Sequence, residues 1–209
     1  MDLIEILFGQ YSDYSNLHIA LEVTAIVASL LSVYFSFKNS VLVFPFGIVS
    51  TVIYVYLLLQ WNLLGDMIIN GYYFIMSVYG WYIWSQVHDG NNVTPITATH
   101  RKEWNTAVLV TLAGALAVFI VYKTSDRLEA WVSYVDMITT GIFFAGMWLM
   151  ARRKLEHWLV LLVGNVISVP LYVYKGYTFS ALLYLILAII AYFGFVAWKK
   201  YIENARQVA

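Results

Sequence analysis

Polar and aromatic side chains recur at helical spacing in three strongly apolar segments, a pattern typical of a ligand-binding surface. The segments are residues 66–85, 158–174 and 179–198. Their amides and hydroxyls can hydrogen-bond a ligand, and their rings can stack on a flat ligand or attract a cation. The candidate substrate-binding residues are Asn70, Tyr73, Trp81, Trp84, Asn165, Ser168, Tyr172 and Tyr184.

Lipid cannot satisfy amide or hydroxyl groups, so these stripes should face the interior of a helix bundle or a cavity. Hydrogen bonds between helices would explain Ser168 equally well. Asn70 and Asn165 favour ligand binding, because each is a bulky amide well inside its segment and shares its stripe with aromatic residues. Anchoring at the membrane surface competes with ligand stacking for Trp81 and Trp84, which lie near the end of their segment.

Three acids lie toward one side of the apolar segments and indicate attraction of a cation. They are Glu22, Asp66 and Asp136. An acidic entrance would concentrate cations and repel phosphorylated compounds. Asp66 and Asp136 also begin predicted helices, where a carboxylate stabilises the helix dipole. Both interpretations can hold together.

The residues that the sequence lacks exclude several chemistries. The chain has no cysteine, which excludes disulfides, thiolate metal sites and thiol catalysis. It contains neither an HExxH metal motif nor a GxSxG nucleophile motif, so we expect no catalytic residues, no metal, no cofactor and no enzymatic activity. The formal net charge is zero without a basic block, which argues against nucleic acid as a partner.

The composition requires lipid as the solvent of the fold. The chain is 62% hydrophobic and 11% charged, whereas a soluble domain is about a quarter charged. About 20 apolar residues span the hydrocarbon core. We therefore predict an all-α membrane protein with seven transmembrane helices, at residues 19–37, 41–60, 66–85, 105–122, 132–150, 158–174 and 179–198.

The basic residues predict the orientation of these spans. Seven spans place the two termini on opposite sides of the membrane. Of the 12 Lys and Arg residues, only Lys123, Arg127 and Lys175 fall on the N-terminal side. The positive-inside rule therefore places the N-terminus outside and the C-terminus in the cytoplasm.

The sequence also contains an internal duplication. Tyr54-Val55-Tyr56 followed by Gly80-Trp81-Tyr82-Ile83-Trp84 returns as Tyr172-Val173-Tyr174 followed by Gly194-Phe195-Val196-Ala197-Trp198. The span at 105–122 has no counterpart, so we expect a 3+1+3 arrangement of two parallel repeats, which is typical of transporters. The predicted parts are an N-terminal interfacial segment (1–18), a first three-helix repeat (19–85), a polar loop with a linker helix (86–131), a second repeat (132–198) and a cytoplasmic tail (199–209).

Two further features each have two interpretations. Residues 1–16 lack the basic region of a signal peptide, and Leu3, Ile6 and Leu7 indicate either a short helix on the membrane surface or a disordered segment. Pro170 should kink the helix over 158–174. That bend can serve as a gate or can result from packing alone.

The ordered motifs resemble the PnuC-type vitamin transporters over residues 22–198. Two series carry the resemblance: Trp61…Gly65-Asp66…Asn70…Tyr73…Tyr79-Gly80-Trp81-Tyr82-Ile83-Trp84, and Asp136…Thr139-Thr140…Arg152-Arg153-Lys154-Leu155-Glu156…Trp158…Asn165…Leu171-Tyr172…Lys175-Gly176. The resemblance implies a SWEET-like fold and a homotrimer in the bacterial cytoplasmic (inner) membrane. It also implies facilitated diffusion of a vitamin precursor, nicotinamide riboside or thiamine, which cytosolic phosphorylation then traps.

Two departures from the family pattern bear on the substrate. Nicotinamide riboside members carry Gln where Asn70 stands and a second Trp where Leu161 stands, so the hypothesis favours thiamine, with nicotinamide riboside as the alternative. A seven-helix sensor without transport is a rival from another class, and an intramembrane enzyme is a third. Proton coupling through Glu22 or Asp136 is the alternative to facilitated diffusion.

Overall fold

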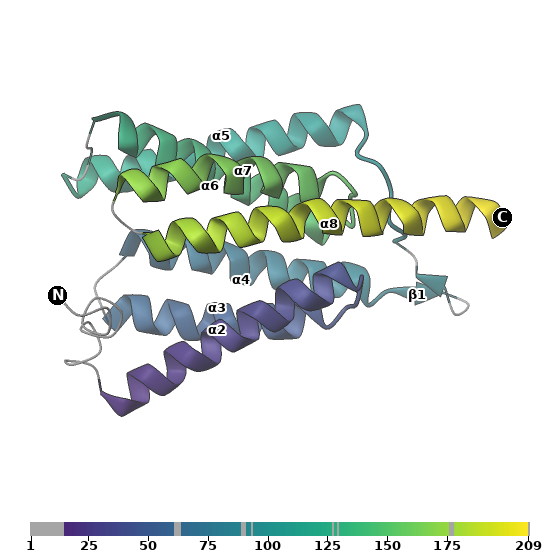
Figure 1. Cartoon of the computed structure of the whole chain (residues 1–209), viewed down its shortest axis with the longest axis horizontal. Helices are drawn as coiled ribbons and strands as arrows, with labels where there is room; N and C mark the ends of the chain where they lie inside the picture. The colour runs from purple at the N-terminus through teal and green to yellow at the C-terminus, as the bar shows by residue number, and fades with distance from the viewer. Residues whose placement is uncertain are drawn as a thin grey trace. The chain divides into compact units, whose positions relative to one another are not determined.

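The computed structural model describes residues 15–60, 64–88, 91–92, 94–126, 128, 130–175 and 178–208. In this part of the chain the helices are α2 (Asn16–Phe37), α3 (Val43–Gln60), α4 (Leu64–Trp84), α5 (Arg101–Thr124), α6 (Ala130–Ala151), α7 (His157–Tyr174) and α8 (Thr178–Val208) (Figure 1). Two short strands, β1 (Val87–His88) and β2 (Asn91–Asn92), pair antiparallel between α4 and α5. The predicted surface helix near the N-terminus falls almost wholly outside the described residues.

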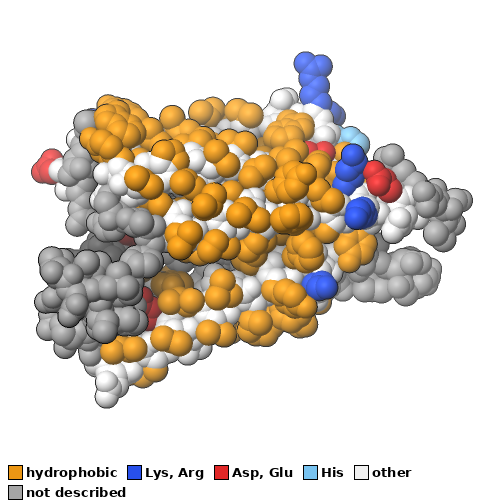
Figure 2. All heavy atoms as spheres, viewed as in Figure 1, with side chains coloured by type: hydrophobic (Ala, Val, Ile, Leu, Met, Phe, Trp, Pro, Cys, Tyr) orange, Lys and Arg blue, Asp and Glu red, His pale blue; other side chains and the backbone are white. Residues whose placement is uncertain are grey.

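The prediction of a helical, multi-pass membrane protein is confirmed. Six described helices are long and apolar enough to cross a membrane, namely α2, α3, α5, α6, α7 and α8. The helix α4 corresponds to the predicted span at 66–85 and has 21 residues, a length of about 30 Å. It is not among these six. Figure 2 shows hydrophobic side chains along the lengths of the helices and the charged side chains near their ends.

Two helices extend beyond their predicted ends. The helix α5 begins at Arg101 inside the predicted polar loop, because the Glu103 carboxylate accepts the backbone N–H of His100 at 2.9 Å and caps the first turn. The helix α8 continues to Val208, so most of the predicted tail at 199–209 is helical. Lys199 and Glu203 lie one turn apart there, with a nitrogen–oxygen distance of 4.0 Å.

The chain forms two compact units, residues 1–74 and 75–209, which are described separately. In the first unit, α2 packs against α3, and the Ser32 hydroxyl donates to the Val43 carbonyl at 2.8 Å. In the second unit, α5 packs against α6, α6 against α7, and α7 against α8.

The turn after α2 is a Schellman-type cap. The backbone N–H of Ser40 donates to the Phe35 carbonyl at 2.9 Å, and that of Asn39 donates to the Ser36 carbonyl at 3.0 Å. Asn39 has a φ of 52°, the left-handed conformation that this cap requires and that Asn tolerates well.

The turn after α6 is capped in the same way. Here the N–H of Lys154 donates to the Leu149 carbonyl at 3.0 Å, and that of Arg153 donates to the Met150 carbonyl at 2.9 Å. Arg153 has a φ of 59°. The two turns therefore share one backbone hydrogen-bond pattern with different residues.

Small residues allow close packing in the second unit. A Cβ atom on Gly141 of α6 would lie 2.2 Å from the carbonyl oxygen of Thr111 in α5, and one on Gly194 of α8 would lie 2.6 Å from the ring of Trp158 in α7. Close backbone approach of this kind is a main source of helix association in membranes.

We predict that Gly141→Ala destabilises the protein by about 1–3 kcal/mol, because the new methyl group must displace the backbone of α5. Gly71→Ala is the matched control, since a Cβ there meets nothing within 4 Å. Thermal unfolding in detergent should show a lower midpoint for the first variant and an unchanged or higher one for the second. Equal midpoints would contradict the packing argument.

Candidate functional site

The predicted substrate-binding residues divide between the two units. Asn70 and Tyr73 lie in the first unit, with the acids Glu22 and Asp66. The second unit contains the remaining residues, Trp81, Trp84, Asn165, Ser168, Tyr172 and Tyr184, together with Asp136. The candidate site is therefore built here from the second unit.

Asn165 is the most informative residue of the site. It lies in the middle of α7 and is only 5% exposed, yet its side-chain amide has no hydrogen-bond partner among the residues that the structure describes. Ser168, one turn further on, donates its hydroxyl to the Gly164 carbonyl of the same helix at 2.9 Å. Because its amide makes no hydrogen bond within the helix of the kind that Ser168 makes, Asn165 is a candidate for a ligand contact and Ser168 a weaker one.

Three neighbouring rings, those of Phe143, Tyr184 and Tyr172, form a group that we call the aromatic wall. The rings of Tyr172 and Tyr184 lie 4.8 Å apart between centroids, and Tyr184 stacks on Phe143 of α6 at 6.0 Å with an interplanar angle of 19°. Phe143 also contacts α7 beside Asn165, because a Cβ on Gly164 would lie 2.7 Å from its ring. Sequence reasoning missed Phe143, since a Phe in an apolar helix carries no distinguishing signal.

The carboxylate of Asp136 lies in an ion pair at one end of this wall. Its Oδ2 atom accepts a hydrogen bond from the Lys175 ammonium at 2.6 Å and another from the Tyr122 hydroxyl at 2.8 Å. The Lys175 ammonium also lies 5.2 Å from the centroid of the Tyr172 ring. Asp136 was predicted to attract a cation, and the cation beside it in the structure is a residue of the same chain.

Trp84 has structural contacts at the end of α4. Its indole N–H donates to the Ala151 carbonyl at 3.2 Å, and the Arg153 guanidinium lies 4.4 Å from its ring centroid. Its ring also contacts Trp198, its counterpart in the duplication, at 5.7 Å. Arg153 donates to the Thr94 carbonyl at 2.9 Å, and burial lowers the pKa of its guanidinium. These contacts give Trp84 a packing role, and its contact with substrate stays a prediction.

The other candidates are less constrained. Trp81 is 44% exposed and lies outside the aromatic wall. In the first unit, the Asn70 amide donates to the Asp66 carbonyl of its own helix at 3.0 Å, and Tyr73 contacts the ring of Tyr72 at 6.1 Å. The Glu22 Oε2 atom is buried and has no hydrogen-bond partner within the described residues.

Leu161, which departs from the family pattern, has a packing role. A Cβ on Gly146 of α6 would lie 2.5 Å from its side chain, so Leu161 fills the space above that glycine. A larger ring at position 161 would therefore need a different α6–α7 contact.

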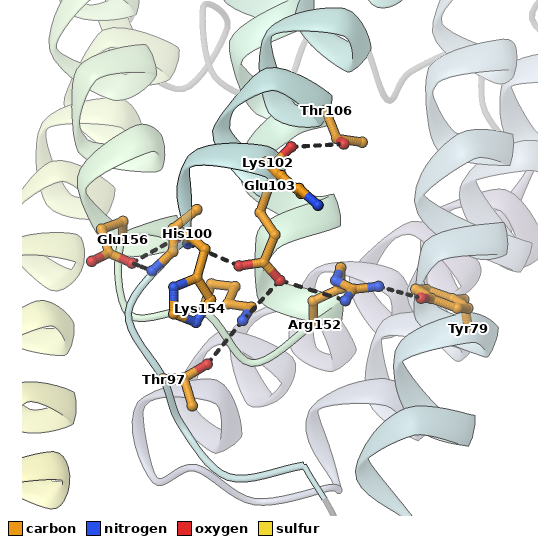
Figure 3. Close-up of polar contacts among 10 residues, drawn as sticks. Tyr79, Thr97, His100, Lys102, Glu103, Thr106, Arg152, Lys154 and Glu156 are labelled. Atoms are coloured by element: carbon orange, nitrogen blue, oxygen red, sulfur yellow. Dashed lines mark hydrogen bonds and ion pairs between the residues drawn. The ribbon is translucent and has the colours of Figure 1, made fainter.

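A second group of polar residues joins the segment before α5 to the α6–α7 turn, and we call it the polar clasp: Thr97, Thr99, Glu103, Lys154 and Glu156 (Figure 3). The Lys154 ammonium contacts Glu103 Oε1 at 2.8 Å and the Thr97 hydroxyl at 2.9 Å. Glu156 Oε2 accepts the backbone N–H and the hydroxyl of Thr99 at 2.7 and 2.6 Å. The clasp fixes the start of α5 against the turn.

Arg152 lies at the edge of the clasp. It approaches Glu103 at 3.5 Å and the Tyr79 hydroxyl at 3.4 Å. Its side chain is 40% exposed, so solvent weakens this pair compared with the more buried Lys154–Glu103 pair.

The sequence of the chain is similar to those of known vitamin transporters. Residues 19–200 match the family model described as nicotinamide mononucleotide transporter. The nicotinamide riboside transporter PnuC of Escherichia coli (strain K12) is 24% identical over 211 residues, covering 90% of this chain and 87% of that protein. The riboflavin/roseoflavin transporter RibM of Streptomyces davaonensis is 25% identical over 125 residues, covering 59% of this chain and 58% of RibM.

The fold is also similar to a solved one. The crystal structure of the vitamin B3 transporter PnuC aligns with a TM-score of 0.64 at 20% identity, covering 95% of this chain and 86% of that one. The two chains therefore share a fold.

We predict that Glu103→Gln destabilises the protein by about 1–3 kcal/mol, because it leaves the nearly buried Lys154 ammonium without its carboxylate. Adding Lys154→Met should recover part of the loss, since the double variant has no unpaired charge. Thermal unfolding of the single and double variants forms a double-mutant cycle. Strictly additive losses would show that the two charges do not interact.

Proposed function

The chain belongs to the nicotinamide mononucleotide transporter family, and we propose that it carries a cationic vitamin precursor, nicotinamide riboside, across the bacterial inner membrane. Relatives from Escherichia coli and Haemophilus influenzae are named nicotinamide riboside transporters. The hypothesis favouring thiamine has no support from these comparisons, whereas its alternative has. RibM makes riboflavin the second candidate substrate.

The buried amide of Asn165 is the observation that carries the site assignment. An amide offers one acceptor oxygen and two donor protons, which match the carboxamide or the ribose hydroxyls of a nicotinamide riboside. The adjoining rings of Phe143, Tyr184 and Tyr172 supply a surface on which the pyridinium ring stacks. Asn70, Tyr73, Trp81, Trp84 and Ser168 are proposed as further substrate-binding residues.

Charge favours the riboside over its phosphorylated form. Glu22, Asp66 and Asp136 lie toward the outer ends of their helices in the predicted orientation, and their field attracts a pyridinium cation. A phosphate group would add negative charge to the ligand and weaken this attraction. Riboflavin, which is uncharged, would gain nothing from it.

The proposed mode of transport is facilitated diffusion by alternating access. The proposed fold is SWEET-like with a 3+1+3 arrangement of its helices, and phosphorylation in the cytoplasm traps the substrate. The proposed assembly is a homotrimer embedded in lipid. The relatives are named as transporters, which favours transport over the sensor and enzyme alternatives.

We predict that Asn165→Ala weakens nicotinamide riboside binding about tenfold, because it removes a hydrogen bond worth about 1–1.5 kcal/mol to the ligand. The free protein should keep its unfolding midpoint, since the amide has no partner in the described structure to lose. Titration calorimetry with nicotinamide riboside, thiamine and riboflavin would measure affinity. Val166→Ala is the control, because Val166 is the next residue of α7 and is 55% exposed.

Equal affinity of the wild type and Asn165→Ala would reject the site assignment. Stronger wild-type binding of thiamine or riboflavin would reject the substrate while keeping the site. Binding without any uptake would favour the sensor alternative.

We also predict that uptake into liposomes does not depend on a pH gradient. Facilitated diffusion needs only the substrate gradient, whereas coupling through Glu22 or Asp136 would need protons. Radiolabelled nicotinamide riboside uptake with and without a protonophore should proceed at the same initial rate. A large loss of flux with the protonophore would instead support proton coupling.

A further inference from the structure

The ion pair between Asp136 and Lys175 places a cation of the protein where a cationic ligand would find its best contacts. The Lys175 ammonium lies 2.6 Å from the Asp136 carboxylate and 5.2 Å from the centroid of the Tyr172 ring. A carboxylate and an aromatic face are the two groups that attract a cationic aromatic molecule. The pair is largely shielded from solvent, with side-chain exposures of 20% for Lys175 and 18% for Asp136.

The ammonium adjoins the proposed site directly. Tyr172, which it covers, contacts Tyr184 at 4.8 Å, and Tyr184 stacks on Phe143. A pyridinium that slides along this wall toward Asp136 would meet Lys175 first. Two positive charges beside one carboxylate repel each other at short range, so a pyridinium binds Asp136 more favourably when the Lys175 ammonium moves away.

We propose that Lys175 is a tethered substitute for the substrate cation. It holds Asp136 in the empty carrier, releases that carboxylate when a cationic ligand enters, and returns to it when the ligand leaves. This inference rests on the proposed function, since it requires that the transported molecule is a cation.

The position of Lys175 suits such an exchange. Its backbone is fixed, because its N–H donates to the Leu171 carbonyl at 3.0 Å at the end of α7. Its side chain is a flexible four-carbon stem with a compact charge. The ammonium can therefore leave Asp136 by rotation of the side chain alone, while the helix stays in place.

The exchange would also help the empty carrier to change conformation after it releases the substrate. After release, the empty carrier changes conformation with the Asp136 carboxylate still in place, and a poorly solvated carboxylate that loses its cationic partner is costly. Lys175 supplies the missing charge from within the chain. The empty carrier then needs no proton or metal ion to accompany its return.

The same exchange sets the apparent affinity. A ligand that must displace Lys175 binds only to the fraction of protein in which Asp136 is open, which lowers its apparent affinity by that fraction. An uncharged ligand does not need Asp136, so the ion pair does not affect its binding.

The first test compares Lys175→Met with the wild type as full-length protein in lipid nanodiscs. The ligands are nicotinamide riboside, which is cationic, and its reduced dihydro form, which has nearly the same shape and no charge on the ring. We expect the variant to bind the cation about tenfold more tightly and the uncharged form with unchanged affinity. Lys123→Met is the matched control, because Lys123 lies in the last turn of α5 and contacts Phe119 instead of Asp136.

The second test measures flux of nicotinamide riboside through Lys175→Met in liposomes. Net uptake into empty vesicles requires the return of the empty carrier and should slow severalfold. Exchange of labelled for unlabelled substrate returns the carrier loaded and should persist. The double variant Asp136→Asn with Lys175→Met has no charge left at this position and should bind both forms of the ligand with similar affinity.

Three results separate the possible failures. Equal loss of affinity for both ligands in Lys175→Met, with a lower unfolding midpoint, would show that the pair only ties the helices together and would overturn the inference. An unchanged affinity for the cation would also overturn it. A wild type that binds and transports neither form would reject the proposed function, and with it the premise of the inference.

Discussion

Hydrocarbon offers no hydrogen-bond partner, so each polar group of this chain must find one within the protein or in the molecule that it carries. Many of the described polar side chains have a partner within the protein. The hydroxyl of Thr139 bonds to a carbonyl of its own helix, and Lys154 bonds to Glu103 and Thr97 at once. Asn165 is 5% exposed, and no hydrogen bond joins its side-chain amide to a residue that the structure describes. A buried amide beside aromatic rings is the physical basis for proposing a binding role.

The helices were predictable because their signals are local. Long apolar stretches predicted seven spans, and six of the described helices are long and apolar enough to cross a membrane. The ends were harder to predict, since they depend on single contacts. The Glu103 cap begins α5 at Arg101, inside a stretch that composition marks as a loop. The helix α8 continues past Trp198, the predicted end of its span, because Lys and Glu are good helix formers.

The partners of the site residues were not predictable, because they are far apart in sequence. The stripe on α7 pointed to Asn165 and Tyr172, but no local pattern pairs Asp136 with Lys175 or brings Phe143 against Tyr184. The basic run beginning at Arg152 illustrates the same limit. The positive-inside rule places this run on the cytoplasmic side. Arg153 and Lys154 are nevertheless buried and hold the α6–α7 turn. One residue can satisfy both the positive-inside rule and a packing requirement.

The two matching turns also bear on how the chain enters the membrane. The hydrogen bonds of each turn lie within six consecutive residues, so they can form as soon as those residues leave the ribosome. A pair of helices joined by such a turn can insert as a hairpin, because the backbone of its bend is already satisfied. Arg153 adds a topological anchor to the second hairpin, since carrying a guanidinium through hydrocarbon is costly. Insertion in pairs would then set the arrangement of these helices in each newly made molecule.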